Sequence, residues 1–257
     1  MPAKLISYSN PFHSNCDANN NNNTVNTIED LVCYCARVSN PSNQNIQDNN
    51  KNDKLIRYLI KNSHWSPFEM VSICLEIVTT RDIARQILRH RSFSFQEFSQ
   101  RYAVVDMGFE ERECRLQDDK NRQNSIKIVT CDIENCHDKC KDSCTKNCDR
   151  CKNNSLSKEW NEKQNEIFEK VKTTYDWAIS NGIAKEQARA ILPEGNTISK
   201  MYVNGTLRSW IHYIQLRSGN GTQQEHRNIA VECAKAIEPI FHMINEFVYD
   251  NDNTKTV

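Results

Sequence analysis

Apolar and polar side chains alternate along two short stretches of the chain, and this two-residue period predicts β-strands. In residues 71–77 the apolar positions are Val71, Ile73, Leu75 and Ile77, separated by a serine, a cysteine and a glutamate. One face of this strand should therefore be buried. Residues 4–8 alternate more weakly and predict an edge strand.

Several other stretches carry apolar residues three or four positions apart, which is typical of helices that bury one face. The predicted helices span residues 28–38, 54–61, 81–90, 160–179, 185–192, 207–216 and 223–248, the last interrupted near Pro239. Pro193 ends one of them and Gly182 closes another. This order predicts a mixed α/β (α+β) fold, a single domain over residues 1–257 with a small mixed sheet flanked by several long helices.

Polar tracts interrupt this pattern and predict segments outside the core. Residues 15–26, with five consecutive asparagines, and residues 40–52 are predicted to be flexible loops. Residues 116–157 are polar and rich in cysteine, with almost no apolar periodicity, and are interpreted as an insertion. Residues 249–257 are expected to form a flexible tail.

Composition adds limits on the partners of the protein. The chain has 257 residues, 38% of them hydrophobic, with 33 basic and 33 acidic side chains. A net charge of zero argues against a general attraction to nucleic acid or membrane, so any phosphate site must be local. No stretch approaches the ~18 apolar residues of a membrane helix, and residues 1–10 carry no secretory signal. We therefore expect a soluble, intracellular protein, cytoplasmic by default, with no membrane or nucleic-acid partner.

The segment from Arg89 to Arg101, called here the signature segment, concentrates charged and hydroxyl groups. It begins with Arg-His-Arg, continues through Ser94, Glu97 and Ser99, and ends with a further arginine. Clustered cations repel one another, so an anion among them would stabilise the segment, and guanidinium groups bind phosphate through paired hydrogen bonds. The segment starts at a predicted helix end and runs into a predicted loop, where sites are commonly built.

Several arginines lie at predicted helix ends or in loops. They are Arg85, Arg89, Arg91, Arg101, Arg189 and Arg217. If they converge, they form a site for phosphates or for a planar acidic ring. Each one alone is explained as well by capping helix carbonyls or by facing water. In the same way His64, His90 and His212 could be structural histidines, and the aromatic residues near them could belong to the core.

The signature segment has the spacing RHRxxSxxxxSxR, which resembles the signature of flavin-dependent thymidylate synthases. Six specified positions within thirteen residues rarely match by chance. Further similar segments cover most of the chain from about Cys35 to Val248. They are Ala36–Ser39, His64–Glu69, Ile83–Gln86, Arg189–Pro193 and Leu207–Arg217.

The resemblance implies which residues contact the flavin and which contact the nucleotide. The residues implied to contact FAD are His64, Ser66, Arg89, His90, Arg91, Glu97, Arg208 and His212. The residues implied to hold dUMP are Gln86, Arg89, Glu97, Ser99, Gln100, Arg101, Arg189 and Arg217. The resemblance also implies a homotetramer with composite active sites, in which Arg189 and Arg217 come from a neighbouring subunit.

The reaction implied by the resemblance is the reductive methylation of dUMP to dTMP. NADPH reduces FAD, methylenetetrahydrofolate supplies the carbon, and Arg217 activates the uracil by favouring its ionised form. Such enzymes use no cysteine nucleophile, and no cysteine lies in the similar segments beside the dUMP residues. Two positions depart from the family pattern, because Met70 stands where histidine is common and His212 stands where some members have asparagine.

The cysteine-rich insertion contains six thiols and one imidazole within residues 131–151. Four such groups suffice to bind zinc or another thiophilic metal. The candidate ligands are Cys136, Cys140, Cys144, Cys148 and Cys151. Their spacing lacks the paired CxxC pattern of a zinc ribbon, so an unstructured insertion and disulfide formation stay open as alternatives. None of these outcomes alters the expected active site.

Two other functions fit parts of the pattern. The chain could be a homologue that binds FAD and nucleotide without synthase activity. It could also be a zinc-containing protein that binds nucleic acid, although arginines scattered among apolar helices do not form the basic stripe such proteins use. A bound flavin spectrum would separate the two flavoproteins from the nucleic-acid-binding protein.

Overall fold

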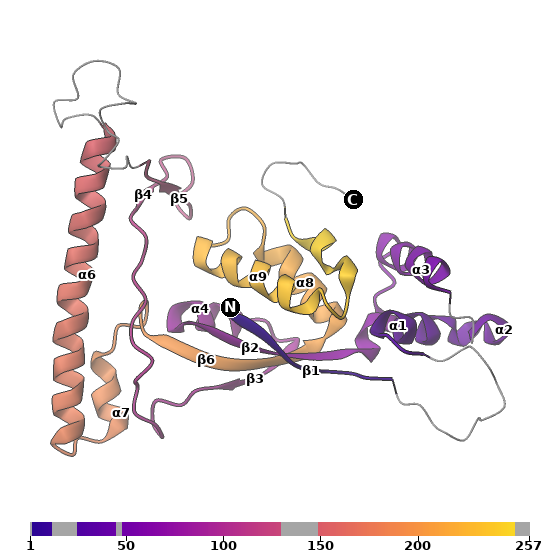
Figure 1. Ribbon diagram of the computed structural model, residues 1–257, viewed down its shortest axis with the longest axis horizontal. Coiled ribbons are helices and arrows are strands. Elements are labelled where there is room, and N and C mark those ends of the chain that lie inside the picture. Colours follow the sequence, from indigo (N-terminus) through magenta and orange to yellow (C-terminus); the bar gives the residue numbers. More distant parts are fainter. Residues whose placement is uncertain (1, 12–24, 45–47, 130–148, 250–257) are drawn as a thin grey trace. The chain divides into compact units, whose positions relative to one another are not determined.

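The computed structural model describes residues 2–11, 25–44, 48–129 and 149–249 (Figure 1). The predicted loop at residues 15–26 and the predicted tail at residues 249–257 lie almost wholly outside these ranges. So do four of the candidate metal ligands, Cys136, Cys140, Cys144 and Cys148. Within the described ranges, no group of three or more His, Cys, Asp or Glu residues is arranged to bind a metal ion. No helix in these ranges is long and apolar enough to cross a membrane.

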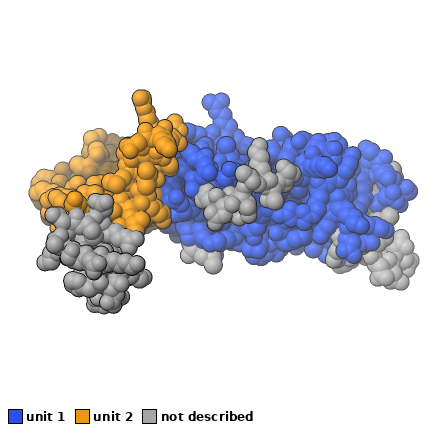
Figure 2. Space-filling model, turned by 90° about the horizontal axis from the view of Figure 1, so that it is seen from above, with its two compact units in different colours: residues 1–79, 83–98, 200–257 blue, residues 80–82, 99–199 orange. Residues whose placement is uncertain are grey.

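The chain is divided into two compact units (Figure 2). Unit 1 comprises Met1–Thr79, Ile83–Phe98 and Lys200–Val257, and unit 2 comprises Thr80–Asp82 and Ser99–Ser199. The chain therefore enters unit 2 twice and returns to unit 1 each time. The signature segment is divided, because its residues up to Phe98 belong to unit 1 and its last three residues belong to unit 2.

The larger sheet has four strands in the order β1-β2-β6-β3 (Figure 1). They are β1 (Ala3–Tyr8), β2 (Ser72–Thr80), β3 (Phe93–Glu97) and β6 (Ile198–Thr206). β1 runs antiparallel to β2, and β3 runs antiparallel to β6. The Leu207 N–H donates to the Val71 carbonyl at one end of the β2–β6 pair. The Arg81 N–H donates to the Thr197 carbonyl at the other end, so this pair is antiparallel too.

The predicted mixed α/β fold class is confirmed, with one correction. The sheet is antiparallel in all three strand pairs, where a mixed sheet was predicted. Antiparallel pairing needs no helical crossover between neighbouring strands, so the order of strands and helices along the chain does not determine strand direction.

The predicted strand at residues 71–77 is β2, which lies between β1 and β6. The side chains of Ile73, Leu75 and Ile77 are fully buried, as the alternation predicts. Burying each such side chain contributes about 1.5–3 kcal/mol, so β2 anchors the core. Helix α8 (Leu207–Arg217) packs into the same core, and its Trp210 donates from Nε1 to the Ile73 carbonyl at 3.0 Å.

The sequence pattern does not predict the other two strands, β3 and β6. β6 escapes it because the small residues Ser199 and Gly205 occupy part of its buried face. The prediction of a loop within the signature segment is wrong, since residues 93–97 form β3 at the edge of the sheet. Phe93 is paired with Gly205 in the register, and a Cβ on that glycine would lie 2.2 Å from Phe93 Cδ1. Glycine at this position therefore leaves room for the Phe93 ring.

The asparagine-rich segment at residues 40–52 was predicted to be a loop and is partly helical. It contains α2 (Pro41–Gln44) and the start of α3 (Asn49–Lys61). Asp48 caps α3 by accepting hydrogen bonds from two backbone N–H groups of its first turn. Asn52 is buried, and its Nδ2 donates to Asp30 Oδ1 at 2.8 Å. These contacts outweigh the modest helix propensity of asparagine.

Most of the predicted helices are confirmed. Those that contribute to unit 1 are α1 (Ile28–Ala36), α3, α4 (Arg81–Ile87), α8 and α9 (Gln224–Ile237), with the 3-10 helices η1 (Arg37–Ser39), η2 (Ser66–Met70) and η5 (His242–Phe247). Thr27 and Asp30 start α1 with a capping box, in which each side chain accepts a hydrogen bond from the other residue's backbone. The final helix is interrupted as predicted, because α9 ends before Pro239 and η5 follows it.

Unit 2 contains the long helix α6 (Asp149–Ser180), followed by α7 (Lys185–Ala188) and η4 (Arg189–Ile191). Phe168 of α6 stacks on Phe109 with 5.0 Å between ring centroids. Gly182, with φ of 76°, ends the helix as predicted. A hairpin of β4 (Arg115–Gln117) and β5 (Ser125–Lys127) precedes α6 in the sequence. The predicted insertion at residues 116–157 therefore contains regular structure at both of its ends.

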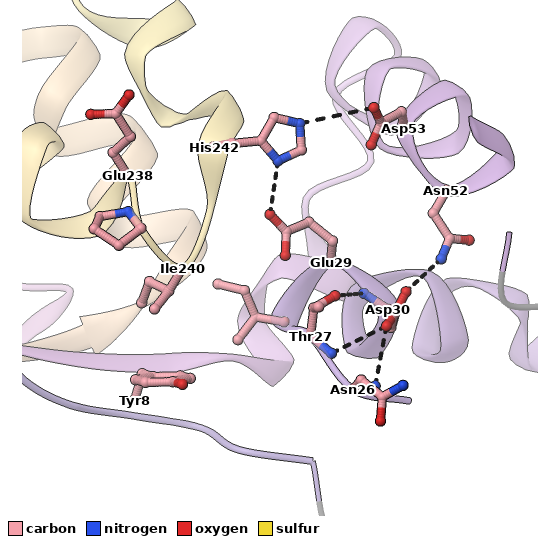
Figure 3. Close-up of a pocket in the computed structure, with 12 residues that line it drawn as sticks. Tyr8, Asn26, Thr27, Glu29, Asp30, Asn52, Asp53, Glu238, Ile240 and His242 are labelled. Carbon is pink, nitrogen blue, oxygen red and sulfur yellow. Dashed lines mark hydrogen bonds and ion pairs between the residues drawn. The ribbon is translucent and has the colours of Figure 1, made fainter. Parts of the chain in front are cut away.

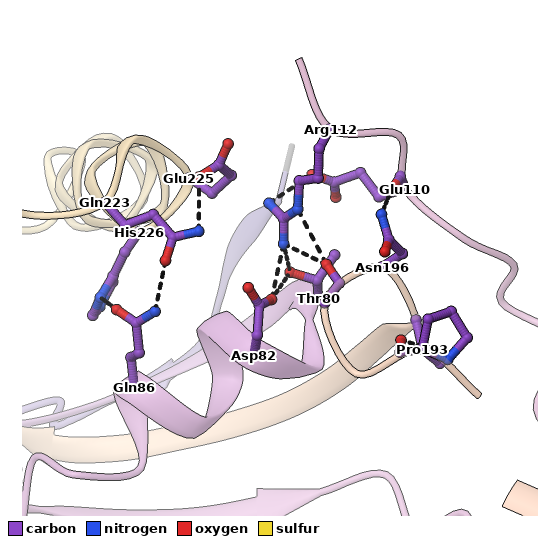
Figure 4. Close-up of polar contacts among 12 residues, drawn as sticks. Thr80, Asp82, Gln86, Glu110, Arg112, Pro193, Asn196, Gln223, Glu225 and His226 are labelled. Atoms are coloured by element: carbon purple, nitrogen blue, oxygen red, sulfur yellow. Dashed lines mark hydrogen bonds and ion pairs between the residues drawn. The ribbon is translucent and has the colours of Figure 1, made fainter. Parts of the chain in front are cut away.

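Arg112 joins three segments of unit 2 (Figure 4). Its Nη2 donates to Asp82 Oδ1 at 2.8 Å and to the Gly195 carbonyl at 2.7 Å. The same nitrogen donates to Thr80 Oγ1 at 2.5 Å. The backbone N–H of Arg112 donates to Gln164 Oε1 of α6 at 2.7 Å. Within unit 2, these bonds link α6 to Thr80–Asp82 and to the segment at Gly195.

Candidate active site

The signature segment starts in the turn after α4 and continues into β3. The Arg89 N–H donates to the Gln86 carbonyl and the His90 N–H to the Ile87 carbonyl, so the chain turns sharply at the helix end. Arg89 and Arg91 are exposed, whereas His90 is half-buried with its ring against the aromatic core. The two guanidinium groups are therefore accessible to a ligand, and the imidazole between them is turned inward.

His90 meets Arg217, which lies at the end of α8. Arg217 Nε donates a hydrogen bond to His90 Nε2 at 2.9 Å. Because Nε2 accepts, the proton of the neutral ring lies on Nδ1. Burial, with a further contribution from the Arg217 charge, lowers the pKa of His90 to about 4, so the ring is neutral near pH 7. The structure thus brings two predicted site residues together and leaves the charge on the arginine.

Glu97 is paired with the arginine that precedes the signature segment. Arg85 Nη1 lies 3.0 Å from Glu97 Oε2, and the Glu97 side chain is 16% exposed. Because the arginine is 45% exposed, the pair contributes little to stability. Its main effect is to hold a carboxylate, which can only accept hydrogen bonds, at the end of β3.

Gln86 belongs to a row of hydrogen-bonded side chains in unit 1 (Figure 4). Gln86 Nε2 donates to Gln223 Oε1 at 2.8 Å, and Gln223 Nε2 donates to Glu225 Oε2 at 3.0 Å. On the other side, Gln86 Oε1 lies 3.1 Å from His226 Nδ1. His226 Nε2 lies 3.2 Å from the Tyr213 hydroxyl. Sequence reasoning missed all of these partners of Gln86, and the only signal was a glutamine and a histidine three positions apart at the start of a predicted helix.

Helices η2 and α8 bring a second group of predicted residues together. The rings of Trp65 and His212 meet edge to face, with 4.7 Å between their centroids. Arg208 Nη1 contacts Glu69 Oε1. Burial, followed by the charge of Arg208, lowers the pKa of His212. His212 is therefore a neutral hydrogen-bonding group near pH 7, and Arg208 is the cation of this group.

His64 and Ser66 lie at the start of the same group, and both are exposed. The His64 ring stands edge-on to Tyr58, with 6.0 Å between centroids. Ser66 is the first residue of η2. The predicted flavin contacts of unit 1 therefore fall into two sets, one at η2 and α8 and one at the signature segment.

Unit 2 carries the other predicted site residues, which are Ser99, Gln100, Arg101 and Arg189. Gln100 is 4% exposed, and its Nε2 has no hydrogen-bond partner among the described residues. A buried donor without a partner costs about 1–3 kcal/mol, so a bound acceptor would relieve this cost. Arg101 Nη2 lies 3.5 Å from Glu186 Oε2, and Arg189 is the first residue of η4.

Most of the chain matches known proteins. The profile of the family described as thymidylate synthase complementing protein matches residues 23–241. A probable flavin-dependent thymidylate synthase of Paramecium bursaria Chlorella virus 1 is 43% identical over 234 residues, which cover 91% of this chain and 92% of the viral protein. The chain belongs to the flavin-dependent thymidylate synthase family. A flavin-dependent thymidylate synthase of Synechocystis is 46% identical over 207 residues, covering 80% of this chain and 83% of its own.

The fold of this family member also matches solved structures. The structure of a UMP/dUMP methylase, PolB from Streptomyces cacaoi, bound with 5-Br dUMP, superposes with a TM-score of 0.71. The match covers 95% of this chain and 93% of PolB at 21% sequence identity. At that identity the likeness establishes a common fold.

The two residues that depart from the pattern of the flavin-dependent thymidylate synthase family, Met70 and His212, lie in different environments. Met70 ends η2 with its side chain 54% exposed, so it contributes little to the core. The His212 ring packs edge to face on Trp65 and is influenced by the Arg208 charge, and it keeps a hydrogen-bonding atom where some members have an asparagine amide. The change at Met70 therefore alters the surface near η2, whereas the change at His212 preserves its polarity.

A pocket of this family member lies in unit 1 and is lined by none of the predicted site residues (Figure 3). It is lined by Tyr8, Asn26, Thr27, Ile28, Glu29, Asp30, Asn52, Asp53, Glu238, Pro239, Ile240 and His242. His242 Nδ1 lies 3.2 Å from Glu29 Oε1, and His242 Nε2 lies 3.9 Å from Asp53 Oδ2. The Asp30 carboxylate is occupied by the cap of α1 and by Asn52. The pocket is acidic and shares no residue with the active-site groups.

We expect the stability of this family member to fall in mild acid. His226 is fully buried, and burial, followed by the Arg217 and His90 charges, lowers its pKa from 6.5 to about 3. The unfolded chain takes up this proton near pH 6.5 and the folded chain does not. The free energy of unfolding should therefore drop by about 1.4 kcal/mol per pH unit from this residue as pH falls from 6.5 toward 3.

Urea denaturation at pH 7, 6 and 5 measures this slope. The matched variant His226→Asn carries no titrating ring. The fall in its free energy of unfolding per pH unit should therefore be smaller by the contribution of about one bound proton. Equal slopes in the two proteins would contradict the prediction.

Proposed function

We propose that the protein is a flavin-dependent thymidylate synthase, which converts dUMP to dTMP by reductive methylation. The observation that carries the proposal is the hydrogen bond from Arg217 to His90. It brings the arginine expected to activate the uracil against the Arg-His-Arg start of the signature segment. Two motifs that are far apart in the sequence thus meet where the proposed chemistry needs a fixed positive charge.

Arg217 is proposed to stabilise negative charge on the uracil ring. Its Nε is engaged by His90, which orients the guanidinium and leaves its terminal amino groups to contact the nucleotide. Because His90 is neutral, the arginine is the positive charge of the pair. A fixed cation beside the ring favours the ionised form of the uracil and lowers the barrier for attack by its carbon.

The two sets of predicted flavin contacts, one at η2 and α8 and one at the signature segment, have groups suited to a flavin nucleotide. Arg89, Arg91 and Arg208 supply cations for its phosphates, and the neutral ring of His212 supplies a hydrogen-bonding group for a planar polar ring. His64, Ser66, His90 and Glu97 are proposed as its further contacts. Bound FAD, once reduced by NADPH, supplies the hydride, and methylenetetrahydrofolate supplies the carbon.

The residues proposed to contact the nucleotide are Gln86, Arg89, Glu97, Ser99, Gln100, Arg101, Arg189 and Arg217. Among them Gln100 offers a buried donor that has no partner among the described residues. We further propose that the whole chain acts as a single catalytic domain and assembles as a homotetramer. In this assembly Arg189 and Arg217 of one subunit reach the nucleotide of a neighbouring subunit, while Arg217 is held by His90 of its own subunit.

Two thiols of unit 1 are poorly suited to act as a cysteine nucleophile. Cys33 and Cys233 are both fully buried. Burial raises the pKa of Cys33 to about 12 and raises that of Cys233 as well. A buried thiol that stays protonated does not attack a pyrimidine ring.

The test is an assay of the purified full-length protein with FAD, NADPH, methylenetetrahydrofolate and dUMP. The proposal expects a bound flavin spectrum and formation of dTMP that depends on all four compounds. A bound flavin without dTMP formation would favour a homologue that lacks synthase activity. Protein without any flavin spectrum, and without dTMP formation, would overturn the proposal altogether.

A further inference from the structure

His226 lies at the centre of a directional row of hydrogen bonds. The row begins at the Tyr213 hydroxyl, passes through His226 and the Gln86 and Gln223 amides, and ends at Glu225 Oε2. Its donor–acceptor distances lie between 2.8 and 3.2 Å. His226 and Tyr213 are almost completely buried, whereas Gln86 is half-buried and so keeps one side open to a ligand.

The chemistry of the two ends leaves one arrangement of protons in the row. A carboxylate only accepts, so Glu225 requires the amino group of Gln223 and leaves the Gln223 carbonyl to accept from Gln86 Nε2. The Gln86 carbonyl then faces His226, which must donate from Nδ1. His226 Nε2 is left as an acceptor, and the Tyr213 hydroxyl donates to it.

His226 keeps this proton arrangement near neutral pH. Burial, followed by the charge of Arg217 and by that of His90 once it is protonated in acid, lowers the pKa of His226 to about 3, so the ring carries a single proton near pH 7. If the Gln86 amide turned over, its amino group would meet the Nδ1 proton and its carbonyl would meet the Gln223 carbonyl. Both contacts would be repulsive in a partly buried site. The amide of Gln86 is therefore locked.

We propose that His226 is a positioning residue, which holds the Gln86 amide so that its second N–H group is presented to the nucleotide. The proposal rests on the proposed function, because it takes dUMP as the ligand of Gln86. His226 itself does not need to touch the nucleotide. It acts by preventing the amide from presenting its carbonyl, which would repel the oxygen acceptors of a pyrimidine or a phosphate.

Two substitutions test the roles of the two ring nitrogen atoms of His226 separately. The amide of asparagine reaches the place of Nδ1, so His226→Asn can still donate to Gln86. The longer side chain of glutamine places its amide at Nε2, so His226→Gln keeps a partner for Tyr213 and loses the donor to Gln86. The measured quantity is the dissociation constant of dUMP for the FAD-loaded full-length protein, with the thermal midpoint as a check of folding.

We expect His226→Gln to weaken dUMP binding about tenfold and to raise KM more than it lowers kcat, as the loss of one oriented hydrogen bond implies. His226→Asn should stay within about threefold of the unchanged protein. In a Gln86→Ala background, His226→Gln should have no further effect, because the group that it positions is gone. Tenfold weakening that persists in that background would overturn the proposal, and so would unchanged binding in His226→Gln.

If His226→Gln does not fold, Tyr213→Phe tests the same proposal. It removes the hydroxyl that donates to Nε2, so the imidazole can move its proton to Nε2 and lose the donor to Gln86. We expect dUMP binding about threefold weaker, and no effect in the Gln86→Ala background. Unchanged binding in Tyr213→Phe would overturn the proposal.

The outcomes separate this proposal from the proposed function. Unchanged protein that binds no dUMP would refute the proposed function, and the positioning role with it. Unchanged protein that binds dUMP and forms dTMP, alongside a His226→Gln variant that binds dUMP equally well, would refute the positioning role alone.

Discussion

Replacement of Arg217 by alanine is expected to lower the rate of dTMP formation by about 10²–10³, with the fold intact. Arg217 ends α8 and donates to His90, so its removal takes away the positive charge and the orienting bond of the proposed site. The variant should also titrate differently. Because the Arg217 charge helps to lower the pKa of His90 and of His226, both values should rise, which ¹H–¹⁵N NMR of the two rings measures.

Two further variants serve as controls for this result. Arg217→Lys keeps the charge but has no planar fork, so it should recover only part of the lost rate. Arg122→Ala removes an exposed arginine of the turn between β4 and β5 and should leave the rate unchanged. Near-normal turnover by Arg217→Ala would refute the catalytic role that we propose for this residue.

Replacement of Gly205 by alanine is expected to destabilise the protein by about 1–3 kcal/mol. The new Cβ would lie 2.2 Å from Phe93 Cδ1 and 2.6 Å from Phe93 Cε1, far inside van der Waals contact. Phe93 cannot move freely, since its ring packs on Trp210 and Tyr213 with centroid distances of 4.6 and 5.8 Å. Urea denaturation of the FAD-loaded protein measures the loss.

The reason for this loss can be tested with a second substitution. Phe93→Leu shortens the ring side chain, so Gly205→Ala should cost less in the Phe93→Leu background than in the original protein. Gly195→Ala is the matched control, because a Cβ there meets no atom within 4 Å. An equal loss from Gly205→Ala in both backgrounds would show that the clash with Phe93 is not its cause.

Sequence reasoning predicted the elements whose burial follows a simple period. β2 alternates strictly, and α8 has its apolar residues at helical spacing, so both were recognised. β6 was not, because a serine and a glycine stand on its buried face and their side chains carry no hydrophobic signal. For β3 the pattern predicts a loop because charged residues and serines dominate it, although Phe93 and Phe95 alternate within the strand. The helical start of α3 was missed because tertiary contacts of Asn52 stabilise it.

The residues of the candidate site that lie in a sequence motif could be predicted. Those that depend on contacts made by the folded chain could not. The contact between His90 and Arg217 joins two residues that lie in motifs of the sequence. Gln223 and His226 lie outside every similar segment, and their importance, like that of Tyr213, comes from the partners that the fold gives them. A single sequence does not reveal that a histidine in α9 faces a glutamine in α4. The candidate metal ligands at residues 136–148 lie outside the described residues and remain a prediction.

Strand β6, which completes the sheet of unit 1, is synthesised late in translation. β6 pairs with both β2 and β3, yet residues 98–197 are synthesised between β3 and β6. On the ribosome, β2 therefore emerges with one edge unpaired and with the apolar face of Ile73, Leu75 and Ile77 uncovered by Trp210. Open strand edges of this kind recruit other chains. The nascent protein should thus depend on chaperones during the interval in which unit 2 is translated, and translation speed through that stretch should govern its yield.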